Sequence, residues 1–278
     1  MSYRYVARLG LFTALLAVVA ACNNGAPPPD SFAVSFDGAK DSNAAAQLAH
    51  GERLTWVLGC QGCHGKGMTG NQWDDDPAGY GVMWATNLTR AVPTMNDAQL
   101  LAVLQRGQHP TRAELWLMPS QLFQHLSAAD IKALVLYLRT LKPQGDVSPP
   151  PVLGPKARSE IAAGKYRPAA SMVSTYRTVL PADAGPEHAL GRYITAVTCA
   201  ECHGIKLEGD AAGTPDLIVA GAYTRPEFEL MLTKGIALHG RKIDPLMSQV
   251  ARSRFSKLTP HERDAIYAYL IARAAKPQ

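Results

Sequence analysis

Two segments far apart in the chain repeat one pattern of apolar and polar positions. Residues 123–141 read FQHLSAADIKALVLYLRTL, and residues 255–273 read FSKLTPHERDAIYAYLIAR. In both segments apolar side chains recur at the three- and four-residue spacing of one helix face, which predicts an amphipathic helix. These positions are Ile131, Leu134 and Leu138 in the first copy and Ile266, Tyr269 and Leu270 in the second.

Each of these predicted helices begins with a capping signal. Ser127 and Thr259 precede the helical pattern, and each is followed three residues later by an acid, Asp130 or Glu262. This arrangement is close to a capping box, in which the two side chains satisfy N–H groups of the first turn. Pro260 also fits a first turn, where its missing N–H has no partner.

A second repeat lies upstream of each helix. Residues 51–65 read GERLTWVLGCQGCHG, and residues 191–204 read GRYITAVTCAECHG. Each unit thus begins with a helix that leads into a cysteine motif and ends with the amphipathic helix. The loops between them are rich in Gly, Pro and Asn, which leaves too little regular structure to fill a core without a large rigid group. The repeat predicts two domains of one plan.

The cysteine motifs indicate what that rigid group is. Four of the five cysteines lie in two C-x-x-C-H motifs. On a helix, Cys60 and Cys63 share a face, and His64 follows at the next position. This pattern is the sequence signal for a c-type haem, whose iron takes a histidine as its usual first axial ligand. The second motif consists of Cys199, Cys202 and His203. We therefore predict two covalently bound haem c groups.

Three other interpretations of these motifs stay open at the level of sequence. A thioredoxin-like C-x-x-C does not need the histidine and follows a strand of an α/β sheet. One structural zinc site would combine both cysteine pairs, but such pairs usually lie about 15–20 residues apart, whereas these begin at Cys60 and Cys199. A disulfide within each motif would close a strained short loop. The histidine and the repetition favour haem.

The N-terminus predicts export. Arg4 and Arg8 precede an apolar run over residues 9–21, which is too short for a permanent membrane span but suits a signal peptide. The run ends in Val-Ala-Ala-Cys, which resembles a bacterial lipobox, and in that family the cysteine, here Cys22, is lipidated. The alternative is an ordinary signal peptide cut after Ala21. Export agrees with haem c chemistry, because bacteria attach this haem outside the cytoplasm.

The order of segments follows from these signals. Residue 23 is Asn rather than Asp, so an outer-membrane anchor is favoured over retention at the inner membrane, on the periplasmic side in either case. The predicted segments are a lipoprotein signal peptide (1–21), a flexible tether (22–45), a first domain (46–143), a Pro-rich linker (144–185) and a second domain (186–278). The length of the linker suggests that it packs across one or both domains.

These residues resemble the small class I cytochrome c fold, used twice, and the whole chain is similar to di-haem cytochrome c lipoproteins. The resemblance implies an all-α fold in which each domain wraps around its haem. Similar paired domains occur as electron-transfer subunits of membrane-bound alcohol and sugar-acid dehydrogenases and in respiratory cytochromes. Redox partners of that kind (a dehydrogenase, another cytochrome or an oxidase) are therefore expected.

The resemblance also implies a methionine as second axial ligand, in a loop before the last helix. The matching residues are Met118 and Met247, although the second loop is longer before its phenylalanine (247–255 against 118–123). His109 and His239 are the rival ligands.

Two further residues are matched to the surroundings of the haem. Pro215 resembles the family proline whose carbonyl accepts a hydrogen bond from the iron-binding histidine. Asn87 stands at the corresponding place in the first domain, where we expect it to bond either near the histidine or to a haem propionate.

The sequence favours an electron carrier over an enzyme. With histidine and methionine on each iron, the metal exchanges electrons but does not readily bind substrate, and no Gly-rich phosphate loop in a βαβ context is present. A di-haem peroxidase, which needs one iron open to peroxide, is the main alternative, and a haem-based sensor is a third. The haem motifs and the exported compartment argue against nucleic-acid binding.

Charge adds a docking hypothesis. The formal net charge is +5, and basic residues gather around Met247. They are Arg241, Lys242, Arg252, Arg254, Lys257 and Arg263. They are expected either to pair with haem propionates or to form a basic rim for an acidic redox partner, unless they are an ordinary solvated surface.

Overall fold

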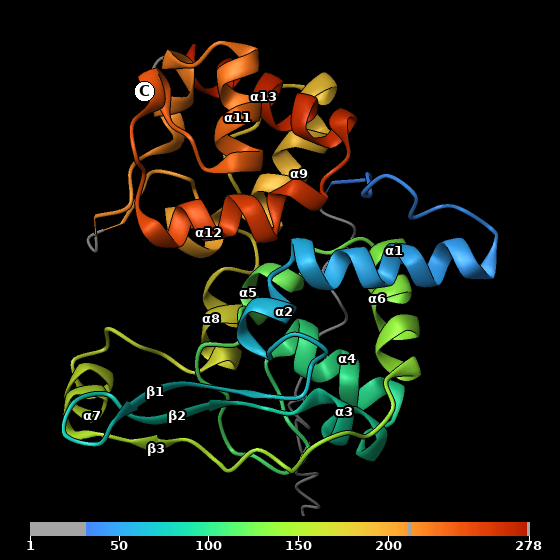
Figure 1. The fold of residues 1–278 in the computed structure, drawn as a ribbon, viewed down its shortest axis with the longest axis vertical. Coiled ribbons are helices and arrows are strands. Elements are labelled where there is room, and N and C mark those ends of the chain that lie inside the picture. The colour runs from blue at the N-terminus through green and yellow to red at the C-terminus, as the bar shows by residue number, and fades with distance from the viewer. Residues whose placement is uncertain (1–31, 211–212, 277–278) are drawn as a thin grey trace, which may run out of the picture.

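The computed structural model describes residues 32–210 and 213–276 and confirms a mainly helical fold. Figure 1 shows two helical units stacked along the long axis, the first in blue to green and the second in orange to red. Within the described residues no helix has both the length and the apolar character needed to cross a membrane. The predicted signal peptide, Cys22 and the first part of the tether lie outside the described residues.

The helices follow the repeat that the sequence contains. Those of the first unit are α1 (Ala44–Val57), α2 (Cys60–Cys63), α3 (Leu88–Ala91), η1 (Val92–Thr94), α4 (Asp97–Arg106), α5 (Ser120–Phe123) and α6 (Ala128–Thr140). Those of the second are η2 (Pro186–His188), α9 (Ala189–Val197), α10 (Ala200–His203), η3 (Leu217–Ala222), α11 (Arg225–Lys234), η4 (Leu238–Gly240), α12 (Pro245–Ser253), η5 (Phe255–Lys257) and α13 (Pro260–Ala274).

The first and last helices of each unit cross at a glycine. α1 packs on α6, and α9 packs on α13. A Cβ on Gly51 would lie 2.1 Å from the Ala133 carbonyl oxygen, and one on Gly191 would lie 2.0 Å from that of Ala265. Only a residue without a side chain therefore lets the backbones approach this closely.

A small sheet in the first unit was not predicted. β1 (Asn71–Asp76) pairs antiparallel with β2 (Gly81–Ala85), and β2 pairs with β3 (Val152–Leu153). The hairpin lies between the haem motif and α3, where the described residues of the second unit form no strand. β3 belongs to the linker, as do α7 (Pro155–Ala162) and α8 (Ala169–Thr175). The linker therefore packs on the first unit, where α7 lies against the sheet (Figure 1).

Residues 32–41, here called the strap, run between the two units. The Phe36 side chain is 2% exposed. Its N–H donates to Asp130 Oδ2 at 3.1 Å, and the N–H of Asp37 donates to Glu262 Oε1 at 2.9 Å. The flexible tether expected over 22–45 is therefore wrong for this part, because the strap buries an aromatic side chain and bonds to both units.

The contacts between the units are reciprocal. From α1, Arg53 Nη1 donates to Glu262 Oε2 at 2.7 Å. From α9, the Tyr193 hydroxyl donates to Asp130 Oδ2 at 2.7 Å. Arg53 and Tyr193 occupy the same position of the repeat, as do the two acids, whose side chains are fully buried. The units therefore pack about an approximate two-fold axis, as in a symmetric dimer.

We expect Gly51→Ala to destabilise the protein by about 1–3 kcal/mol, because the new methyl group overpacks the crossing of α1 and α6. The measurement is the free energy of unfolding in urea. Gly221→Ala is the matched control, because a Cβ there meets only Ala274 Cβ at 3.5 Å. Equal losses for both variants would contradict the close approach.

We expect Arg53→Met to cost about 3 kcal/mol, because it leaves Glu262 buried without its ionic partner. The same urea titration measures the loss. Lys165→Met removes an exposed positive charge that lies 3.9 Å from Glu160 and should change stability by no more than about 0.5 kcal/mol. A loss for Arg53→Met as small as this control would show that the pair between the units adds little.

Candidate haem-binding sites

Each cysteine motif forms a turn of helix that presents two thiols. α2 follows Gly59, whose φ of 84° turns the chain sharply after α1. The four cysteines of the motifs are free. Burial raises the pKa of the Cys60 thiol to about 12 and that of Cys199 to about 11. The thiols that would bind haem are therefore protonated at neutral pH.

Both histidines are held by a backbone carbonyl. His64 Nδ1 donates to the Thr86 carbonyl at 2.7 Å, and His203 Nδ1 donates to that of Pro215 at 2.8 Å. Burial lowers the pKa of His64, which keeps it neutral. With Nδ1 occupied in this way, Nε2 is the ring nitrogen free to bind a metal, which is the arrangement that histidine ligands need. The donor set therefore fits a haem in each unit.

The loops after the two motifs have the same hydrogen bonds. The N–H of Gly70 donates to the His64 carbonyl and that of Gly209 to the His203 carbonyl, each at 2.9 Å. Met68 and Leu207 stand at the same place in these loops, each with a positive φ and a fully buried side chain. The two sites thus share one backbone frame as well as one motif.

The carbonyl that holds the histidine comes from Pro215, as the resemblance implied, but its counterpart is Thr86 rather than Asn87. Asn87 is 1% exposed and caps α3 by accepting from the N–H of Thr89. Its amide donates to the carbonyls of Gln144 and Asp146, each at 2.8 Å. Linker carbonyls therefore accept both amide hydrogens of Asn87 in the described structure, and its bond to a propionate stays a prediction.

The two candidate methionines lie on different kinds of backbone. Met118 is in a loop that ends at α5, between Leu117 with φ 63° and Pro119. Met247 is in the first turn of α12, whose N–H groups are capped by Asp244. The loop expected there is a helix because Pro245 and Asp244 start one in the longer segment. Both side chains are half-buried and pack against the hydrophobic core.

The rival histidines lie nearer the surface. His109 Nδ1 accepts hydrogen bonds from the N–H groups of Thr111 and Arg112. His239 is exposed, with φ 57° in η4. His109 is half-buried like the two methionines, but only Met118 and Met247 pack against the hydrophobic core.

Comparisons with known proteins agree with these sites. Residues 188–272 match the family model of cytochrome c, and residues 46–138 match that of subunit III of cbb3-type cytochrome c oxidase. No curated protein matches the chain. Each match contains one C-x-x-C-H motif and the helices that surround it. These matches support a cytochrome c with two domains, and domains of this kind carry covalently bound haem c and act in electron transfer.

Proposed function

We propose that this protein is a membrane-tethered di-haem cytochrome c that relays single electrons between redox proteins at the periplasmic face of a bacterial membrane. It would serve there as the electron-transfer subunit of a dehydrogenase. The observation that carries the proposal is that both domains have the same fixed histidine and a half-buried methionine before the last helix. A bound haem supplies a one-electron couple between ferric and ferrous iron.

The residues around each site would favour electron exchange over substrate chemistry. The carbonyls of Thr86 and Pro215 orient the histidine rings and increase their basicity as ligands. A thioether from Met118 or Met247 would stabilise ferrous iron and raise the potential. Because both axial positions would be filled, neither iron would be open to peroxide.

The position of the strap supports a short tether between the two domains and the membrane. Residues 23–31 separate the predicted lipidated Cys22 from the strap, and a chain of that length spans at most about 30 Å. Because the strap is bonded to both domains, lipidation would hold the domain interface close to the membrane. An outer-membrane anchor remains the preferred location.

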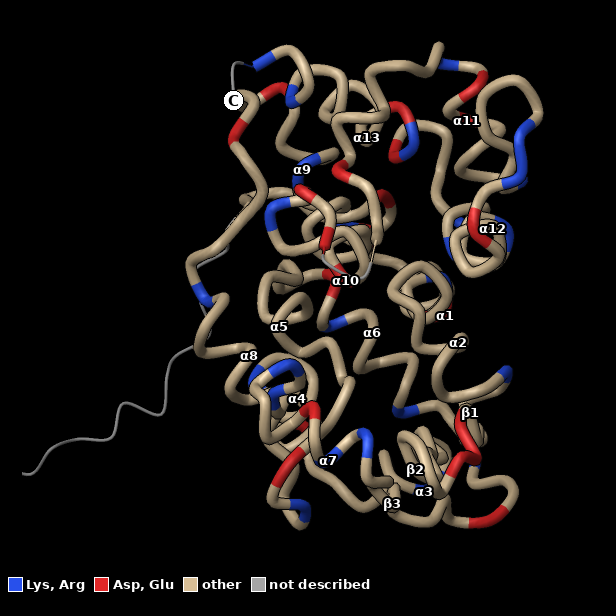
Figure 2. Tube along the Cα trace, turned by 90° about the vertical axis from the view of Figure 1, so that its left-hand side faces the viewer, with Lys and Arg blue, Asp and Glu red and all other residues tan. Residues whose placement is uncertain are grey.

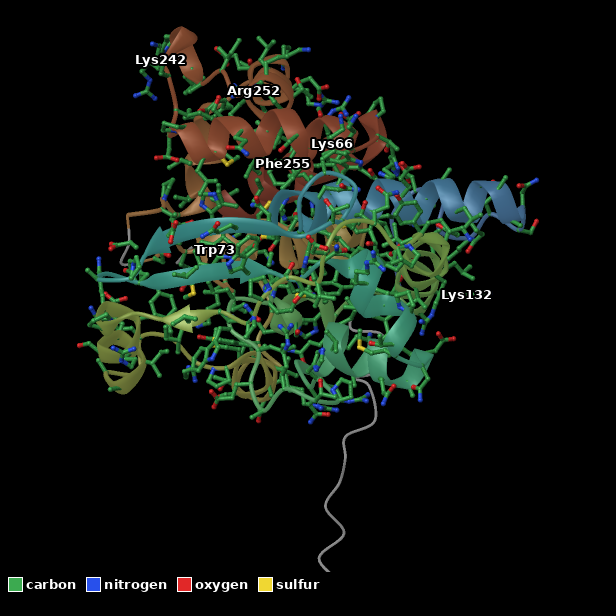
Figure 3. All side chains as sticks on the ribbon, turned by 60° about the horizontal axis from the view of Figure 1, so that its bottom comes forward. Lys66, Trp73, Lys132, Lys242, Arg252 and Phe255 are labelled. Atoms are coloured by element: carbon green, nitrogen blue, oxygen red, sulfur yellow. The ribbon has the colours of Figure 1, made fainter. Side chains whose placement is uncertain are left out.

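A basic surface on the second domain supports docking of an acidic partner. Of the six basic residues around Met247, Arg254 and Arg263 pair with Glu201 and Glu229. The other four, Arg241, Lys242, Arg252 and Lys257, are exposed. Figure 2 shows basic positions gathered at α12 and the segment beside it, and in Figure 3 Lys242 and Arg252 project from the second domain. Exposed charges of one sign steer a partner of the opposite sign.

We expect Met118→Ala and Met247→Ala each to remove part of the weak far-red charge-transfer band of methionine-bound ferric haem. The measurement is the optical spectrum of the oxidised haem-loaded protein. Each variant should also lower the midpoint potential of one haem, whereas Met68→Leu should leave the band unchanged because Leu207 already fills the equivalent position.

A band from one haem only in the wild-type protein would favour the peroxidase alternative. Binding of carbon monoxide to the reduced wild-type protein would likewise indicate an open iron.

We expect the wild-type protein to contain two irons per chain. The double variant Cys60→Ala/Cys63→Ala should contain one, and Cys199→Ala/Cys202→Ala should also contain one, because each pair attaches its own haem. Iron analysis and the absorbance of the denatured haem give the ratio. A ratio of one in the wild-type protein would rule out a di-haem carrier.

A further inference from the structure

The haem-attachment segments of the two domains meet at one side chain. Arg254, which follows α12, donates from Nε to the Val57 carbonyl at 3.1 Å. Its guanidinium also covers Gly59, where a Cβ would lie 2.7 Å from Arg254 Cζ. From Nη1 it donates to Glu201 Oε2 at 2.7 Å. Val57 and Gly59 lead into the first motif, and Glu201 lies between the cysteines of the second.

The arginine side of this junction is shielded from solvent, whereas Glu201 lies at the surface. The side chains of Arg254 and Glu201 are 12% and 27% exposed. In Figures 1 and 2, α12 lies beside α1 and α2, on the side of the second domain that faces the first.

The junction departs from the two-fold relationship of the domains. The repeat places Leu122 at the position of Arg254 and Gly62 at that of Glu201. Leu122 is buried and Gly62 has no side chain to pair. The contacts of Arg53 and Tyr193 occur as an equivalent pair, whereas this ion pair occurs once. One ion pair thus serves both attachment segments.

We infer that Arg254 is a positioning residue that joins the two haem-attachment segments, so that electrons pass between the haems within one molecule across this junction. The inference rests on the proposed function and adds to it the route that electrons take between the two haem-binding sites. Haems held by Cys60 and Cys63 and by Cys199 and Cys202 would supply a ferrous donor and a ferric acceptor, so that the one electron lost at one site would be gained at the other. No further oxidant or reductant takes part.

The charge of Arg254 has a defined effect on both sites. A positive charge disfavours ferric relative to ferrous iron, so it raises the midpoint potential of a haem beside it. Glu201 opposes this effect. The guanidinium contacts both attachment segments, so its removal should lower the midpoint potentials of both haems. If the ion pair served one domain only, its loss would change the potential of one haem.

The first experiment is a redox titration of the haem-loaded protein. In Arg254→Leu, which introduces the residue of the equivalent position, the ferrous-to-ferric ratio of both haems at a fixed potential should fall about tenfold, or about 59 mV for a one-electron couple. Arg254→Lys keeps the charge and should keep both ratios within about threefold. Arg254→Leu/Glu201→Gln removes both charges and should return both potentials toward the wild-type values.

Arg158→Leu is the matched control, because it removes the same charge from α7, beside the sheet and away from α12 (Figure 1). It should leave both potentials unchanged. A shift in the midpoint potential of one haem only, or equal shifts for Arg254→Leu and Arg158→Leu, would overturn the inference that Arg254 serves both sites. Far-ultraviolet circular dichroism shows whether each variant is folded.

The second experiment measures electron exchange after a flash reduces part of the haem. Exchange across the junction requires a rate that does not depend on protein concentration. A rate proportional to concentration would overturn the inference, because electrons would then pass between molecules. Failure of the proposed function would be visible separately, as missing methionine ligation or a single iron in the wild-type protein.

Discussion

Two buried carboxylates connect the parts of this protein. Asp130 and Glu262 stand at the same position in the first turn of the last helix of each domain. Each carboxylate accepts a strap N–H and a bond from the first helix of the other domain. A buried charge is costly unless hydrogen bonds and opposite charges surround it. Capping, strap and domain interface therefore depend on the same two side chains.

The interface explains how two similar domains act as one unit. The strap lies between the capped helices, and the crossing glycines let each first helix approach its last helix closely. These contacts fix α1 and α9, which lead into the haem motifs. As a result, the two attachment segments reach the same guanidinium, that of Arg254. The symmetric packing thus brings together the segments that carry the chemistry.

Several features depended on residues whose partners lie far away in the sequence. The hairpin of the first domain is completed by a strand of the linker, about seventy residues later. Asn87 was matched to a haem contact because of its place in the repeat, but the linker carbonyls take its amide. Met247 was expected in a loop, and a proline with a capping aspartate makes the segment helical. In each case a local signal or a distant partner outweighed the analogy between the domains.

The resemblance to cytochrome c implied the Pro215 carbonyl beside His203, whereas the sequence by itself determined the helical repeat, the helix caps and the two C-x-x-C-H motifs. These features follow from short-range spacing, because helix periodicity, capping and cofactor attachment involve residues within a few positions of one another. Only the tertiary structure decided the course of the strap, the reciprocal bonds of Arg53 and Tyr193, and the meeting of both motifs at Arg254. Those contacts join residues separated by up to about two hundred positions. Their pairing is set by the packing of two domains, and spacing along the chain does not encode it.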